Sequence, residues 1–260
     1  MLGVLPVSGD LTVPASVTGP AAAADAVIHI PMSHDFGAGE DTDVALTRAV
    51  LDTLAGTGRP FVYTSGTRVY GDTGGRLVSE SDPVNPPPSL RTRAAVEREV
   101  LAAGRLGIRS VVLRPTLTFG DAGSGAMEFL INDALTQRVA RYVGDGANAW
   151  SFVHVEDLAD LYVGALEAAP AGSTVNGAAG DPIPLRALAL AIAETMEPTA
   201  QTVSLPVDEA LAAWGEMGDF LHTDMRISGA LAEELLGWKP RADTVLDDVR
   251  HGSYRLVLRG

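Results

Sequence analysis

The chain has 260 residues, of which 46% are hydrophobic and 20% charged, the balance of a folded globular protein. It contains no cysteine, which excludes disulfides, thiolate nucleophiles and cysteine-ligated metal sites. The formal net charge of −14 would repel nucleic acids and anionic membranes, so we expect neither of these partners and a small-molecule substrate instead. The sequence has no apolar run of membrane-spanning length and does not begin like a signal peptide, so we expect a cytoplasmic protein.

Apolar, β-branched runs alternate with amphipathic segments of helix length along most of the chain. This alternation predicts a doubly wound α/β fold with a parallel sheet. The expected strands cover residues 4–7, 26–30, 60–64, 109–113 and 174–176, and the expected helices cover residues 41–55, 91–103, 126–138, 156–168 and 185–196. Later residues predict the isolated helices 208–217 and 227–236. We therefore expect a core over residues 1–150 and, over 151–260, a strand crossing back to the core followed by a small C-terminal α/β substrate lobe.

Ligands of open parallel sheets bind beyond the carboxyl ends of the strands. A dinucleotide-binding sheet would also open with a strand, a glycine-rich turn and a helix that hold the pyrophosphate. No such turn precedes residues 26–30. The glycine clusters at 71–75 and 120–125 each carry an aspartate where a phosphate would approach, so we interpret both as substrate-side loops.

One long segment, FVYTSGTRVYG at residues 61–71, resembles the extended and atypical short-chain dehydrogenase/reductase superfamily, also called the NAD-dependent epimerase/dehydratase family. Nearly the whole chain supports the resemblance, through GDL at 9–11, VLRP at 112–115, GDGAN at 144–148, SFVHVEDLA at 151–159 and LGWKP at 236–240. The resemblance implies a Rossmann-like fold, here truncated because the N-terminal glycine-rich βαβ segment is missing.

The catalytic set of that superfamily is also altered. The resemblance places Ser89 at the position of the family's proton-transferring tyrosine and Arg93 at the position of its lysine. Gly66 takes the position of the catalytic hydroxyl, between Ser65 and Thr67. A serine hydroxyl is a far weaker acid than tyrosine, and an arginine cannot exchange its proton near neutral pH. We therefore expect that ordinary hydride transfer does not occur at these positions and that the protein uses no cofactor.

Four residues are candidate catalytic groups: His34, Asp35, Arg93 and His154. His34 and Asp35 follow the strand at 26–30, where a histidine beside a carboxylate would act as a general acid or base. Arg93 would bind a carboxylate or enolate oxygen. The alternatives are a solvated loop pair for His34 and Asp35, a structural role for His154 and a surface role for Arg93.

Other residues are expected to bind ligands without reacting. Family position and polarity suggest a substrate pocket lined by Ser65, Thr67, Tyr70, Ser89, Thr116, Thr118 and Trp150, although Trp150 would equally suit a core. Asp10 and Leu11 match the family's adenine-side motif and would bind NAD(P) if that cofactor is used. We expect no metal site, because the five histidines show no metal-ligand spacing.

Loss of the first βαβ segment leaves a gap beside the strand at 26–30. We expect the run at 4–7 to pair there, since unpaired backbone in a core is costly. The family resemblance also implies a homodimer formed through the helices at 91–103 and 41–55.

Our leading interpretation is a repurposed enzyme of this superfamily that catalyses a cofactor-independent, non-redox step on a small metabolite, with secondary metabolism as the setting by analogy. Cyclisation, isomerisation, elimination and hydrolysis all fit. One alternative is an NAD(P)-dependent epimerase/dehydratase-type oxidoreductase with an atypical or upstream-encoded cofactor site. The other is a non-catalytic ligand sensor or partner subunit.

Overall fold

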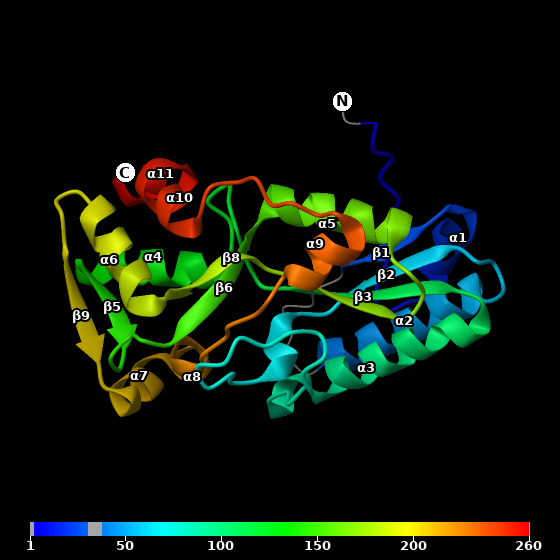
Figure 1. Cartoon of the computed structure of the whole chain (residues 1–260), viewed down its shortest axis with the longest axis horizontal. Coiled ribbons are helices and arrows are strands. Elements are labelled where there is room, and N and C mark those ends of the chain that lie inside the picture. The colour runs from blue at the N-terminus through cyan, green and yellow to red at the C-terminus, as the bar shows by residue number, and fades with distance from the viewer. Residues whose placement is uncertain (1–2, 31–37, 260) are drawn as a thin grey trace. The chain divides into compact units, whose positions relative to one another are not determined.

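The computed structural model describes residues 3–30 and 38–259 and divides into two compact units (Figure 1). Unit 1 consists of the chain up to Val69 together with Pro86–Arg114 and Tyr162–Val175. Unit 2 consists of Tyr70–Asn85, Pro115–Leu161 and the chain from Asn176 onward. The boundary expected between residues 150 and 151 falls inside strand β6 (Ala149–His154), which lies wholly in unit 2.

Unit 1 is built on a four-stranded sheet with the order β1-β2-β3-β7. Its strands are β1 (Val27–His29), β2 (Pro60–Thr64), β3 (Arg109–Pro115) and β7 (Ser173–Gly177), and β1 pairs with β2 and β2 with β3 in parallel. These four correspond to the strands expected from residue 26 onward, so the prediction of a parallel α/β sheet is confirmed.

Helices cover one face of this sheet (Figure 1). They are α1 (Ala15–Ala23), α2 (Ala38–Leu54) and α3 (Arg91–Ala102). Leu54 of α2 and Val100 of α3 pack with Phe61 and Tyr63 of β2, and all four side chains have no exposed surface. The strand β2 is apolar on both faces because both are buried, as expected for a central parallel strand.

The expected strand at residues 4–7 is wrong. These residues form no strand, and Val4, Leu5 and Val7 are 75%, 88% and 67% exposed. Among the described strands, β1 has β2 as its neighbour and lies at the end of the sheet order. Pro6 interrupts the run, and a proline has no N–H to donate to the ladder of a central strand.

Unit 2 contains a three-stranded sheet and a two-stranded sheet. In the first, β6 pairs in parallel with β4 (Leu117–Phe119) and antiparallel with β8 (Ala179–Pro184). In the second, β5 (Val139–Val143) pairs in parallel with β9 (Gln201–Leu205). The core around these strands includes the buried Trp150, Leu188, Ile192 and Tyr254.

The helices of unit 2 up to residue 236 follow the expected order with one break, and the two helices after that residue were not expected. Gly215, at φ +55°, separates α7 (Val207–Trp214) from α8 (Glu216–His222), where one helix over 208–217 was expected. Such a backbone angle suits glycine and ends a helix. The other helices are α4 (Gly125–Gln137), α6 (Leu185–Thr195), α9 (Ala230–Leu236), α10 (Val245–His251) and α11 (Ser253–Arg259), while α5 (Val155–Ala168) has residues in both units. No helix of the described ranges has the length and apolarity needed to cross a membrane.

Candidate functional site

The turn after β2 is the candidate ligand-binding segment of unit 1. Ser65 N donates to Leu113 O at 2.8 Å, which fixes the turn to the end of β3. The Ser65 side chain is 7% exposed, and its Oγ has no hydrogen-bond partner in the described chain. A Cβ added at Gly66 would meet no atom within 4 Å. A buried hydroxyl without a partner beside open space is the arrangement expected where a ligand binds.

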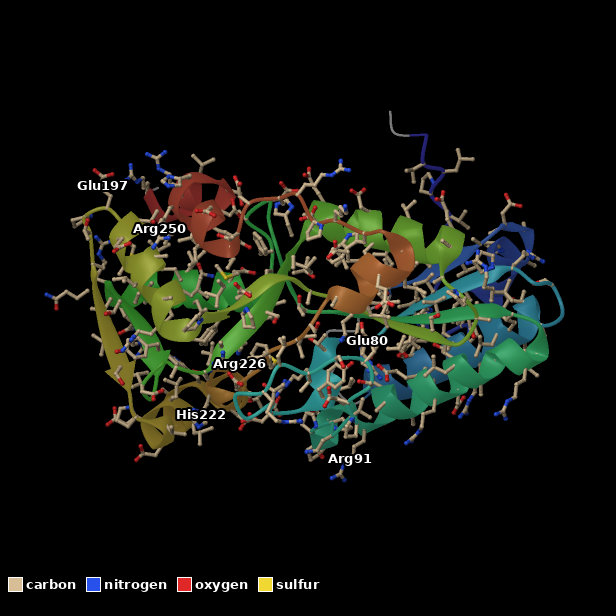
Figure 2. The ribbon with its side chains drawn as sticks, viewed as in Figure 1. Glu80, Arg91, Glu197, His222, Arg226 and Arg250 are labelled. Atoms are coloured by element: carbon tan, nitrogen blue, oxygen red, sulfur yellow. The ribbon has the colours of Figure 1, made fainter. Side chains whose placement is uncertain are left out.

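Arg93 reaches this turn from α3. Its Nη1 donates to Thr64 O at 3.4 Å and to Ser65 O at 3.3 Å. Arg91, two residues earlier, is exposed and extends away from the ribbon in Figure 2. Ser89, at the family's tyrosine position, lies in the short 3-10 helix Pro88–Leu90 and is exposed. Thr67 begins another 3-10 helix, Thr67–Tyr70, and is 5% exposed. The structure therefore brings Arg93 and Ser65 together.

Behind the turn, β1, β2 and α2 bring together a buried polar cluster that the sequence analysis missed. Asp43 Oδ1 lies 2.7 Å from His29 Nε2, and Tyr63 OH donates to Asp43 Oδ2 at 2.7 Å. Burial alone would raise the pKa of Asp43, but these two hydrogen bonds and the charges of His29 and Arg93 hold it below its usual value. Burial and the nearby Asp43 carboxylate raise the pKa of Tyr63, so this phenol stays neutral.

A second missed contact joins β2 to α5. Thr64 Oγ1 and Tyr162 OH lie 2.7 Å apart, and burial raises the pKa of the Tyr162 phenol. Residues 64 and 162 are far apart in sequence, so no spacing pattern could have predicted this pair.

In unit 2, the hydroxyls of Tyr70 and Thr116 donate hydrogen bonds to other residues of the chain. Tyr70 OH donates to Asn176 Oδ1 at 3.0 Å, and Asn176 N donates to Glu80 Oε1 at 2.7 Å. Thr116 Oγ1 donates to Gly177 O at 2.7 Å. The Asn176 contacts connect β7 to Tyr70 and the loop after it, and the Thr116 contact connects β7 to the residue between β3 and β4.

His154 lies at the end of β6 against the turn after β4. It contacts the Phe119 ring edge-on at 5.2 Å, and its Nδ1 accepts from Glu156 N at 3.3 Å. Gly120 makes this position possible, because a Cβ there would lie 2.4 Å from His154 Nε2. Thr118 Oγ1 donates to Thr116 O at 3.5 Å. Trp150 has no exposed surface and its indole N–H donates to Thr223 O at 2.9 Å, so its side chain belongs to the core rather than to a pocket wall.

The remaining predicted site residues have no described contact with the turn after β2. His34 and Asp35 lie outside the described residues. Asp10 and Leu11 are exposed, and the Asp10 carboxylate accepts from Thr12 N at 2.8 Å and from Thr12 Oγ1 at 2.7 Å. In the described ranges no three histidine, aspartate or glutamate side chains gather as a metal site would require.

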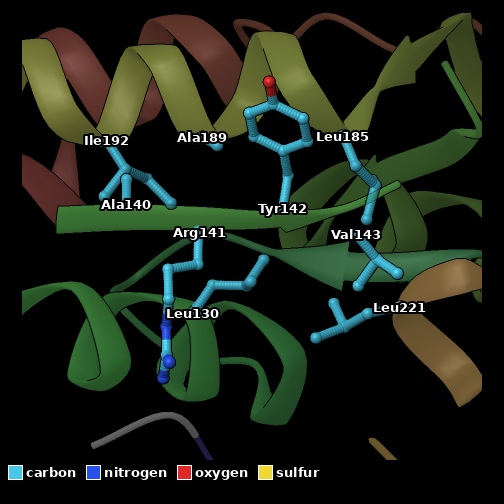
Figure 3. A pocket seen from close by; sticks show the side chains of 9 residues that line it. All are labelled: Leu130, Ala140, Arg141, Tyr142, Val143, Leu185, Ala189, Ile192 and Leu221. Atoms are coloured by element: carbon cyan, nitrogen blue, oxygen red, sulfur yellow. The ribbon is translucent and has the colours of Figure 1, made fainter. Parts of the chain in front are cut away.

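A small apolar pocket in unit 2 lies between β5, α4, α6 and α8 (Figure 3). Its one charged side chain, Arg141, is ion-paired with Asp133 and stacks 4.8 Å from the centre of the Trp214 ring. The pocket thus offers packing space and no unpartnered charge. It is lined by Leu130, Ala140, Arg141, Tyr142, Val143, Leu185, Ala189, Ile192 and Leu221.

The parallel sheet and its helices define a Rossmann-like α/β protein, and comparison with solved structures agrees. DesIV, a dTDP-glucose 4,6-dehydratase from Streptomyces venezuelae solved with NAD bound, superposes with a TM-score of 0.77 over 96% of this chain and 78% of its own, at 19% identity. Residues 5–177 match the sequence profile of the NAD dependent epimerase/dehydratase family, and the chain belongs to this family.

Two relatives extend the comparison. "Uncharacterized protein C2A9.02" of Schizosaccharomyces pombe is 34% identical over 88% of this chain and 78% of its own length. A 2-alkyl-3-oxoalkanoate reductase of Stenotrophomonas maltophilia is 29% identical over 72% of this chain and 62% of its own. The names of the family, of DesIV and of the Stenotrophomonas maltophilia relative include epimerase, dehydratase and reductase activities.

These findings correct our expectation of a protein without a cofactor. The family to which the chain belongs is defined as NAD-dependent, and the DesIV structure that shares its fold holds NAD. The expectation gave too much weight to the missing glycine-rich turn.

The residues of unit 1 fit one end of such a cofactor. The unpartnered Ser65 hydroxyl and the open space at Gly66 suit the nicotinamide and its ribose. Within residues 3–30 and 38–259, no glycine-rich turn joins a strand to a helix ahead of β1, so the described chain shows no pyrophosphate cradle. The described residues of unit 1 therefore fit the nicotinamide end of the cofactor and not its pyrophosphate.

Proposed function

We propose that the protein is a nicotinamide-dependent oxidoreductase that acts on a small carbonyl or hydroxyl compound. The observation that carries the proposal is the family match, which spans the chain from before α1 through β7 and so includes the entire parallel sheet of unit 1. The reductase from Stenotrophomonas maltophilia supports a redox reaction, and the unpartnered Ser65 hydroxyl supports a ligand at the end of β2.

The chemistry is divided between the cofactor and the protein. When bound, the nicotinamide would supply or accept a hydride, and the proton that a carbonyl gains or a hydroxyl loses in the same reaction would be exchanged with water. Ser65 and the Gly66 space would hold its ribose end. Arg93 offers a guanidinium group, which binds and stabilises negative charge and does not serve as a proton donor or base. The neutral Thr64 and Tyr162 hydroxyls orient neighbouring groups by hydrogen bonding.

A conversion with no net redox change is the second candidate for the same site. It is favoured by the family resemblance, which places Ser89 and Arg93 at the positions of the family's tyrosine and lysine and so leaves no proton-transferring pair at these two positions. An isomerisation or elimination of this kind would leave the nicotinamide unchanged after each turnover.

The first test is titration of the purified chain with NAD, NADH, NADP and NADPH by calorimetry and by quenching of its three tryptophans. We expect at least one form to bind at micromolar strength, which is about −8 kcal/mol. Addition of candidate carbonyl compounds should then consume the near-ultraviolet absorbance of the reduced form. A lasting loss of absorbance supports the oxidoreductase, whereas product without such a loss supports the second candidate.

A variant at Gly66 ties the binding to the proposed place. Gly66→Leu would fill the open space without backbone strain, because Gly66 does not have a positive φ. We expect it to weaken nicotinamide binding about tenfold or more. Gly19→Leu is the matched control, since Gly19 is exposed in α1 and also has open space around an added Cβ. No binding to the unmodified chain up to millimolar concentration would contradict the proposal.

A further inference from the structure

An open hollow in unit 2 takes no part in the proposed reaction. It has a volume of about 240 Å³, and it is lined by residues of β8, by the segment at residues 227–229, by α9 and by residues that follow α9. Leu77 also lines it. All of these residues belong to unit 2, whereas Ser65, Gly66 and Arg93 belong to unit 1. The hollow is therefore a separate place where a ligand could bind.

Close backbone contacts shape this hollow. Ser228 N donates to Val78 O at 2.8 Å, which fixes the loop that carries Leu77 beside the segment before α9. Gly229 lets the same segment approach the residue before β8, because an added Cβ there would lie 2.1 Å from Ala178 O. The walls are thus held in place by the fold of unit 2, as is usual for small-molecule sites.

Most of the lining is apolar. Ala178 and Ile227 are 5% and 1% exposed and belong to one small buried cluster. Trp238 supplies an aromatic wall, and its indole N–H already donates to Asp157 O at 2.8 Å. An apolar cavity of about 150 Å³ is large enough to bind benzene. The hollow therefore has room for an aromatic ring that carries a short chain.

The charged side chains at the hollow are both negative. Asp181 of β8 and Glu233 of α9 line it, and both residues are exposed. Neither carboxylate has a hydrogen-bond or ion-pair partner within residues 3–30 and 38–259. Among the described residues that line the hollow there is no lysine, arginine or histidine. An apolar surface beside two carboxylates is complementary to an organic molecule with a positive charge.

We infer that this hollow binds a small organic amine, with its apolar body against Ile227 and Trp238 and its ammonium group beside Asp181 and Glu233. The inference goes beyond the proposed function and does not depend on it, since no residue of the β2 turn takes part. An aliphatic amine is protonated at neutral pH, so both carboxylates attract it. Its hydrocarbon part gains from leaving water. A neutral molecule of the same shape has only the second of these gains.

The test compares 2-phenylethylamine with 2-phenylethanol, which has the same ring and chain but no charge. Binding of each compound to the full chain is measured by calorimetry at low salt. We expect the amine to bind about 3- to 30-fold more tightly than the alcohol, the range for two exposed ion pairs. Added sodium chloride should reduce this preference, because salt screens exposed charges.

Two double variants that change the net charge equally locate the effect. Asp181→Asn with Glu233→Gln should remove the preference for the amine. The control is Asp208→Asn with Glu234→Gln, which makes the same chemical changes at exposed residues of α7 and α9 that do not line the hollow. It should keep the preference. Ala230→Leu, which takes up space in the hollow, should weaken the binding of both compounds about tenfold.

Three results would overturn the inference. The first is equal binding of the amine and the alcohol, or binding of neither up to about 10 mM. The second is a control variant that loses the preference as fully as the Asp181 and Glu233 variant, because the net charge of −14 and not the hollow would then attract the amine. The third is a dimer of the unmodified chain that Ala230→Leu dissociates in size-exclusion chromatography, because a second copy would then cover the hollow.

Discussion

Two glutamates on α3 show how far the environment of a single residue decides its contribution to stability. Glu97 and Glu99 each make a bidentate pair with an arginine. The side chains of the Glu97–Arg114 pair are 2% and 7% exposed, whereas those of the Glu99–Arg48 pair are 40% and 59% exposed. Water screens the second pair and cannot reach the first.

We therefore expect Glu97→Gln to lower the free energy of unfolding by about 3 to 5 kcal/mol, because it removes the carboxylate that is paired with the buried Arg114 guanidinium. Glu99→Gln, with the same chemical change on the same helix, should cost less than about 1 kcal/mol. Urea unfolding followed by circular dichroism measures both. Losses of similar size in the two variants would show that burial of the pair does not govern its energy.

At the scale of elements, Asp224 joins separate segments of unit 2. Its carboxylate accepts hydrogen bonds from Thr73 Oγ1 at 2.8 Å, Gly75 N at 2.7 Å and Ala149 N at 2.7 Å, and it pairs with Arg226, labelled in Figure 2. Burial would raise the pKa of Asp224, but these hydrogen bonds and the Arg226 charge outweigh it and hold the pKa below its usual value.

A lowered native pKa means that the ionised form of Asp224 stabilises the fold above the unfolded pKa of about 3.9. This stabilisation is lost as the pH falls from about 5 through the native pKa. We expect unfolding midpoints of the unmodified protein to fall more steeply with acidification than those of Asp224→Asn, which is already less stable at neutral pH. Parallel pH profiles for the two proteins would rule out this role.

The sequence predicted those elements whose pattern is set by burial alone. Strand β2 is apolar on both faces, and α3 has a clear helical period, so both were found within a residue or two of their bounds. Strand β8 was missed because it contains Gly180, Asp181, Pro182 and Pro184, residues typical of loops. It forms because β6 offers it an antiparallel partner, which is a tertiary effect.

The residues of the candidate site likewise divide into those that the local sequence predicts and those that only tertiary contacts bring together. Ser65 and Thr67 were predicted because they lie in the continuous motif at residues 61–71, and Arg93 because the family resemblance places it at the lysine position. The Asp43 cluster with His29 and Tyr63 was not predicted, because it joins α2 to two strands and no local spacing records that contact. The Arg93 contacts to the β2 turn likewise depend on how α3 packs on the sheet.

At the scale of the whole molecule, the net charge of −14 means that repulsion among excess carboxylates competes with attraction within ion pairs. Described exposed ion pairs such as Arg250–Glu194 each contribute little, so salt weakens them at small cost. Repulsion among the excess carboxylates acts over longer distances and opposes the compact state. The screening length falls from about 30 Å at 0.01 M salt to about 10 Å at 0.1 M, so salt should mainly relieve repulsion.

We therefore expect the melting temperature at neutral pH to rise by a few degrees between about 0.01 M and 0.2 M sodium chloride. Asp52→Asn with Glu167→Gln is the matched variant, because both residues are exposed and lie in the last turns of α2 and α5, where a negative charge opposes the helix dipole. It should be more stable at low salt and should gain less from added salt. A melting temperature that falls with salt would mean that the ion pairs, and not the net charge, dominate the electrostatic stability of this protein.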